Sequence, residues 1–183
     1  MIGLDATRVA AQAALVSLAS YLAGLHSTGM FHDASASMGG LWSAISGIVV
    51  LQATQRDTWS SAWLRLVGTA IGSIISAAYL TMLPFGPIGM AVSVFATVLV
   101  CHVARIPNHA RLAAITVTVI MVTASLNPTL NPIQNAALRF SESCIGIAMA
   151  VLAVLIWPGP KEPPNTAPQI SAIGLSRGLP RVD

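Results

Sequence analysis

The sequence predicts an all-α membrane protein, and three observations lead to this fold class. Hydrophobic residues make up 55% of the 183-residue chain and charged residues only 8%, whereas about a quarter of residues in soluble proteins are charged. Apolar runs of about 15 to 21 residues recur along the chain, close to the length of a helix that crosses a bilayer. Aliphatic rather than aromatic residues supply the mean hydropathy of +0.75, which favours helices over a membrane β-barrel.

The charges and cysteines exclude several classes of protein. The net charge is +3, but the basic residues are scattered singly, so they indicate topology rather than nucleic-acid binding. Cys101 and Cys144 lie inside apolar runs, where cysteine behaves as a small hydrophobic residue. His102 has no second ligand at a suitable spacing on its predicted helix. We therefore expect no disulfide framework, no metal and no cofactor.

The first predicted span covers residues 9–25 and follows Arg8. A cleaved signal peptide is the alternative, because Ala34-Ser-Ala36 resembles a cleavage site. We favour a retained helix, since the apolar run exceeds the usual signal-peptide core and cleavage would fall well beyond its end. Residues 24–37 are then expected to form the first loop.

The second and third predicted spans, residues 38–54 and 63–83, carry small residues at helical spacing. Gly39 and Gly47 share one face of the second span, and Gly68 and Gly72 share one face of the third. Such strips let a neighbouring helix approach closely inside a membrane. Both pairs are therefore predicted to pack helices together.

Three further spans complete the predicted domain, residues 1–157. They cover residues 88–103, 112–126 and 138–157, separated by turns rich in proline and asparagine. The fifth is short and carries hydroxyl side chains, so it is expected to face protein rather than lipid. Residues 158–183 lack a patterned apolar run and are predicted to form a disordered cytoplasmic tail.

Charge and aromatic placement predict the topology. With six transmembrane helices, nearly all basic residues fall on one side of the membrane, which the positive-inside rule assigns to the cytoplasm. Both termini are therefore expected to be cytoplasmic. The residues predicted to lie at this boundary as an aromatic belt are Trp59, Trp63 and Trp157.

Arg65, Arg139 and Glu142 are the polar residues that could carry chemistry. Arg139 and Glu142 lie three apart and can pair on one helix face. They form either an interfacial salt bridge that fixes the helix end, or a site in which Glu142 carries a proton and Arg139 attracts an anion. Arg65 either reaches the cytoplasmic headgroups or draws carboxylates into a path. The sequence leaves both pairs of alternatives open.

Motifs typical of enzymes are absent from the sequence. It contains no phosphate-binding Gly-Lys-Ser/Thr loop, no zinc-protease helix signature and no serine in a nucleophile elbow. We therefore expect a protein that is not an enzyme.

Two longer motifs carry a resemblance to a known family. The first is Leu41-Trp-Ser-Ala-Ile-Ser-Gly-Ile-Val-Val-Leu-Gln52 with Thr58 and Arg65-Leu-Val-Gly68-Thr-Ala-Ile-Gly72; the second is Arg139-Phe-Ser-Glu142-Ser-Cys-Ile-Gly146, leading to Pro158. Together they resemble the fusaric acid resistance family, also called aromatic acid exporters, over most of residues 9 to 158. The positions carried over are Trp42, Gln52, Arg65, Gly68, Gly72, Arg139, Glu142 and Gly146.

The resemblance implies a multi-pass protein of the bacterial inner membrane, in a family that includes proton-driven exporters of aromatic or hydrophobic carboxylic acids. Larger members join two six-helix units to a soluble domain, whereas this chain has one unit. Because an even number of spans lets two copies lie side by side in one orientation, a homodimer or higher homo-oligomer could supply the second unit.

The predicted function is export of small amphipathic organic acids by an inner-membrane transporter subunit coupled to protons. The expected partners are the lipid bilayer and a small organic anion. The residues predicted to line the substrate path are Arg65, Arg139, Glu142 and Gln52, and those predicted to pack helices are Gly39, Gly47, Gly68, Gly72 and Gly146. The alternative is a non-transporting membrane scaffold or accessory subunit of a larger complex.

Overall fold

The computed structural model describes residues 4–157, and within this range the chain is helical and contains no strand. The helices are α1 Leu4–Phe31, a short 3-10 helix η1 Asp33–Ser35, α2 Ala36–Val50, α3 Gln55–Met82, α4 Pro87–Val103, α5 Pro107–Leu126 and α6 Pro132–Ile156. Four of them, α1, α3, α5 and α6, are long and apolar enough to cross a membrane, whereas α2 and α4 are shorter. The all-α prediction is confirmed; the six-span topology stays a prediction, and the predicted tail, residues 158–183, lies outside the described residues.

Capping residues determine where several helices begin. α4, α5 and α6 each have proline in the first turn, where its missing N–H costs no hydrogen bond. Asn131 accepts a hydrogen bond from the Ile133 N–H at 2.9 Å and so caps α6. Thr54 accepts one from the Asp57 N–H at 3.1 Å and caps α3.

Removing the Thr54 cap should destabilise the protein measurably. Thr54→Ala leaves a first-turn N–H without its partner, so we expect the free energy of unfolding to fall by about 1 kcal/mol. Unfolding in detergent micelles measures this loss. The matched control is Thr129→Ala, at an exposed threonine in the turn between α5 and α6, and equal stability of the two variants would contradict the prediction.

Two helices extend further than the apolar runs suggested. α1 continues to Phe31, so residues 24–31 are helical and the prediction that they form a loop is wrong. α6 begins at Pro132, which places Arg139 two turns inside the helix rather than near its end. The reason is local: packing and caps continue a helix through polar residues that a hydropathy window excludes.

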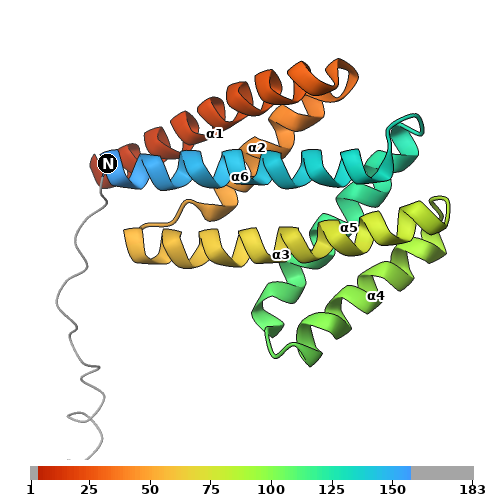
Figure 1. The fold of residues 1–183 in the computed structure, drawn as a ribbon. Coiled ribbons are helices and arrows are strands. Elements are labelled where there is room, and N and C mark those ends of the chain that lie inside the picture. The colour runs from red at the N-terminus through yellow and green to blue at the C-terminus, as the bar shows by residue number, and fades with distance from the viewer. Residues whose placement is uncertain (1–3, 158–183) are drawn as a thin grey trace, which may run out of the picture.

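Contacts between the helices divide α1 to α6 into two groups of three, whose arrangement can be followed in Figure 1. α1 and α2 make a hairpin that packs against α6, and α4 and α5 make a hairpin whose α5 packs against α3. α3 and α6 contact each other and join the two groups. The first half of the chain contains α1, α2 and α3, and the second half contains α4, α5 and α6. The third helix of each half, α3 or α6, therefore packs on the hairpin of the other half.

Small residues allow the closest helix contacts. A Cβ atom on Gly72 would lie 2.6 Å from the Ala113 carbonyl oxygen, and one on Gly68 would lie 2.9 Å from the Leu112 Cβ, so both glycines admit α5 to the surface of α3. A Cβ on Gly47 would lie 2.6 Å from the Ser20 hydroxyl of α1. The interior is therefore closely packed, while large apolar side chains such as Ile74 and Phe95 lie on the outside, as in a helix bundle that faces lipid.

Candidate functional site

The helix pair α3 and α6 carries three ionisable side chains into the interior. Arg65 is 1% exposed, and Arg139 and Glu142 are 0% exposed. Arg65 lies on the buried face of α3, with Thr69 and Gly72 one and two turns further along. The interpretation in which Arg65 reaches the lipid headgroups is wrong, because protein covers its guanidinium.

The Arg65 guanidinium is held by α2. Its Nη2 donates a hydrogen bond to the Ser46 hydroxyl at 3.1 Å, and its Cζ lies 4.8 Å from the centroid of the Trp42 ring, a cation–π distance. Its Nε is buried without a hydrogen-bond partner. Within residues 4–157 no carboxylate pairs with Arg65, so this buried positive charge is balanced only by a hydroxyl group and an aromatic face.

Arg139 and Glu142 form a buried ion pair. Arg139 Nη2 lies 2.8 Å from Glu142 Oε1, and the Thr28 hydroxyl of α1 donates to the same oxygen at 2.8 Å. The Arg139 contact is short but poorly aligned for a hydrogen bond, so it acts as a contact between charges. Because both side chains are fully covered, the interpretation as an interfacial salt bridge at the helix end is wrong.

This ion pair leaves polar atoms unsatisfied. Arg139 Nε and Nη1, together with Glu142 Oε2, are buried and have no hydrogen-bond partner among the described residues. Buried polar groups are nearly always paired, since an unpaired one loses its hydration without compensation. The guanidinium therefore has spare donors that a second carboxylate could accept from.

Two serines connect the arginine sites. The Ser46 hydroxyl, which accepts from Arg65, lies 3.3 Å from the Ser143 hydroxyl of α6. Ser143 donates to the Arg139 carbonyl oxygen at 3.0 Å. Polar contacts thus run from α3 through α2 to α6, directly beside Glu142.

Gln52 lies apart from this cluster. It follows α2, its amide donates to the Val49 carbonyl oxygen at 3.2 Å, and its backbone N–H donates to the Thr58 hydroxyl at 3.1 Å. These contacts hold the turn between α2 and α3. The structure therefore places Gln52 in a turn and not beside Arg65, Arg139 or Glu142.

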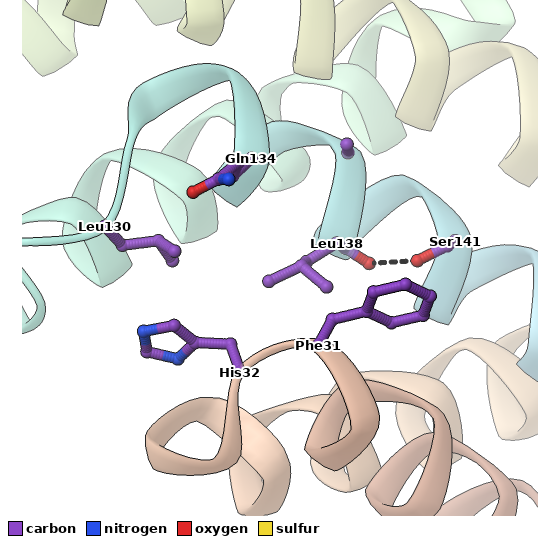
Figure 2. A pocket seen from close by; sticks show the side chains of 7 residues that line it. Phe31, His32, Leu130, Gln134, Leu138 and Ser141 are labelled. Carbon is purple, nitrogen blue, oxygen red and sulfur yellow. Dashed lines mark hydrogen bonds between the residues drawn. The ribbon is translucent and has the colours of Figure 1, made fainter.

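Three pockets of about 290 to 370 Å³ lie between helices. None of them is lined by Arg65, Arg139 or Glu142. The largest lies between the end of α1 and the first turns of α6, where His32, Gln134 and Leu138 surround an open space (Figure 2). Among the described residues, no group of three His, Cys, Asp or Glu side chains is placed to hold a metal ion.

An internal repeat relates the two arginines. Leu64-Arg65 is followed seven residues later by Ile71-Gly72, and Leu138-Arg139 is followed at the same spacing by Ile145-Gly146. The two segments lie on α3 and α6, the third helix of each half of the chain. Sequence reasoning could have found this repeat by comparing the two halves.

Thr28, Ser46 and Ser143 are site residues that sequence reasoning missed. Each is a small hydroxyl residue inside an apolar run, and such residues are common in membrane helices. Thr28 was also expected to lie in a loop. The sequence carries no signal that separates these three from the other serines and threonines, because their partners come from distant helices.

Comparison with known proteins gives one family match. The model of a family described as fusaric acid resistance protein-like matches residues 15–153. This range includes the three buried ionisable residues and the hydroxyl residues that contact them, namely Arg65, Arg139, Glu142, Thr28, Ser46 and Ser143. No curated protein and no solved structure matches the chain.

Proposed function

The chain belongs to the fusaric acid resistance protein-like family of membrane transport proteins, as its motifs predicted, and from this premise we propose that it exports small amphipathic organic acids across the bacterial inner membrane. The observation that supports this proposal is the buried Arg65, which has a hydroxyl group and an indole ring around it but no carboxylate among residues 4–157. An arginine inside a membrane bundle is costly unless it binds a counter-ion or serves a path.

An aromatic or amphipathic carboxylate suits this site chemically. A guanidinium offers a planar pair of donors that matches a carboxylate. The Trp42 ring and the apolar walls of α2 and α3 would favour the hydrophobic part of the same molecule. An inorganic anion would gain the hydrogen bonds to the guanidinium but not the contact with the Trp42 ring and the apolar walls.

The arrangement of the two halves supports transport. Each half has three helices, so if every helix crosses the membrane the halves have opposite orientations. Inverted repeats of this kind are common in secondary transporters, where rocking of one half against the other exposes a central site to each side in turn. Because Arg65 lines none of the three pockets described above, we propose that movement at the α3–α6 contact opens the path, within a homodimer or higher homo-oligomer.

Transport by the purified chain tests the proposal. Reconstituted in liposomes loaded with radiolabelled benzoate, the full chain is expected to release the label faster than protein-free liposomes do, because the blank measures passive leak alone. The rate of release should also depend on the pH difference across the membrane, because export is proposed to be coupled to protons. Release equal to the blank at every pH gradient would contradict the proposed function.

A non-transporting accessory subunit is the second candidate. The observation that favours it is the separation of the three pockets from the buried ionic cluster, since a closed cluster could serve packing alone. This candidate predicts no benzoate flux from the purified chain, together with a stable hetero-complex recovered from native membranes. Flux from the purified chain alone would exclude it.

A further inference from the structure

The two equivalent arginines differ in the residue that follows one turn later. On α3 this residue is Gly68, and the backbone of α5 fills the space beside it. On α6 it is Glu142, whose carboxylate contacts Arg139. Arg65 therefore has no carboxylate at this position of the repeat, whereas Arg139 has the carboxylate of Glu142 on its own helix.

The surroundings of Glu142 form a fitted carboxylate site. The Thr28 hydroxyl and Arg139 Nη2 both contact Oε1 at 2.8 Å. Gly39 of α2 makes room for this oxygen, because a Cβ there would lie 2.8 Å from Oε1 and closer still to Thr28. Oε2 has no hydrogen-bond partner among the described residues, so one oxygen is held in place while the other is free to take a proton.

We propose that Glu142 is a tethered carboxylate that occupies the anion site of Arg139, and that a substrate carboxylate binds there only after Glu142 has taken up a proton. This inference rests on the proposed function. A proton from the aqueous phase adds to Oε2 and gives a neutral carboxylic acid, which removes the attraction to Arg139. The side chain then leaves, and the substrate carboxylate accepts from the donors of Arg139.

This exchange fixes the stoichiometry of coupling. The Arg139 site holds either the Glu142 carboxylate or a substrate carboxylate together with a protonated Glu142, so each anion bound at Arg139 brings one proton with it. The Thr28 hydroxyl positions the occupying carboxylate and stabilises the anion-free state. Reciprocal linkage then requires that anion binding and protonation strengthen each other equally.

The charged and titratable groups around Glu142 are few. Arg139 contacts it from α6, Thr28 faces it from α1 and Gly39 from α2. Arg65 on α3 is connected through Ser46 and Ser143. Of these groups, Glu142 is the one that can exchange a proton, because guanidinium groups keep theirs.

The pocket in Figure 2 lies between the same two helices, α1 and α6, that supply Thr28, Arg139 and Glu142, although none of these three residues lines it. Leu138 and Ser141, which line it, are the sequence neighbours of Arg139 and Glu142. Phe31, which also lines it, lies one turn beyond Thr28 on α1, and His32 follows the end of that helix. The pocket has a volume of about 370 Å³. Its titratable imidazole, His32, is a competing source of pH dependence and needs a control.

Benzoate binding as a function of pH tests the inference. The full chain in lipid nanodiscs is titrated with benzoate between pH 6 and 8, where the probe stays ionised. Affinity should fall by about tenfold for each pH unit once Glu142 is ionised, because one proton is bound with each anion. Calorimetry in buffers of different ionisation enthalpy should find uptake of about one proton for each benzoate.

Three variants test whether the exchange at Glu142, rather than another group, causes the pH dependence of benzoate affinity. Glu142→Gln should bind benzoate with the same affinity at every pH, while His32→Gln should keep the wild-type slope. Thr28→Val should bind benzoate about tenfold more tightly at pH 7.5, because the occupying carboxylate loses a charge-assisted hydrogen bond. The uptake measurement on the wild-type chain keeps the test valid even if Glu142→Gln does not fold.

Two results would overturn the inference and are distinguishable. The exchange at Glu142 is overturned if the benzoate affinity of the wild type does not change with pH. It is also overturned if the affinity of Glu142→Gln changes with pH as steeply as that of the wild type. Either result leaves the proposed export intact. No benzoate binding by the wild type at any pH, together with no flux in liposomes, overturns the proposed function and this inference with it.

Discussion

Replacing Arg65 with glutamine is expected to lower the rate of benzoate export at least about 30-fold, because loss of a desolvated charge partner costs 2 to 5 kcal/mol or more. The variant should still fold. Removal of a buried charge that has no carboxylate partner also removes its desolvation cost, and glutamine can still reach toward the Ser46 hydroxyl. Flux in proteoliposomes and thermal unfolding of the same preparation measure the two effects together.

The matched control for this substitution lies on the same helix. Arg56→Gln removes an equal charge from α3 at an exposed residue, so it reports any effect of net charge on orientation in the membrane. Arg65→Lys keeps the charge but loses the planar fork of donors, and we expect it to retain only part of the activity. Equal flux from wild type and Arg65→Gln, or an equal loss in Arg56→Gln, would remove Arg65 from the transport path.

Replacing Gly146 with alanine should have the largest effect on stability. A Cβ atom there would lie 2.7 Å from the Gly47 backbone nitrogen and 2.8 Å from the Ser46 Cβ, and it would meet the Ser43 carbonyl oxygen at a still closer distance. Backbone atoms cannot rotate away, so α2 would have to move off α6. We expect the free energy of unfolding to fall by about 3 kcal/mol, the upper part of the range for overpacking, and Gly146→Leu to prevent folding.

Gly29→Ala is the control for Gly146→Ala, since it makes the same change within a helix. A Cβ on Gly29 would lie 3.5 Å from the Ala36 Cβ, which is ordinary contact, and alanine should stabilise α1 by up to about 1 kcal/mol. Denaturant-induced unfolding of both variants in one detergent gives the comparison. If Gly146→Ala were as stable as wild type, the close contact of α2 with α6 would be wrong.

Displacement of α2 should also change the contacts of Arg65 and of the Arg139–Glu142 pair. Trp42 and Ser46 hold Arg65 from α2, and Gly39 of the same helix forms the wall beside Glu142. A helix moved to accommodate a side chain at Gly146 would therefore change the surroundings of both guanidinium groups. Substitutions that move α2 are therefore expected to change benzoate flux as well as stability.

Sequence reasoning identified the class of protein and singled out the three ionisable residues that the structure buries between the helices. Arg65, Arg139 and Glu142 stand out because charged residues are rare inside apolar runs, and the small-residue strips stand out by their spacing. The helix ends were less accurate, since residues 24–31 and 132–137 are too polar for a hydropathy window but continue their helices. The repeat on α3 and α6 was visible in the sequence and was missed.

Hydropathy, helix periodicity and short motifs are local properties of the chain, so they identify an apolar, helical membrane protein of a known family. The packing of distant helices buries the three charges inside protein, brings Glu142 into contact with Arg139 and Thr28, and places Trp42 and Ser46 around Arg65. Burial depends on what covers a side chain, and this cannot be read from the neighbouring residues in the sequence. α1 and α2 supply that cover for charges on α3 and α6, and contacts between segments so far apart in the chain leave no trace in local composition.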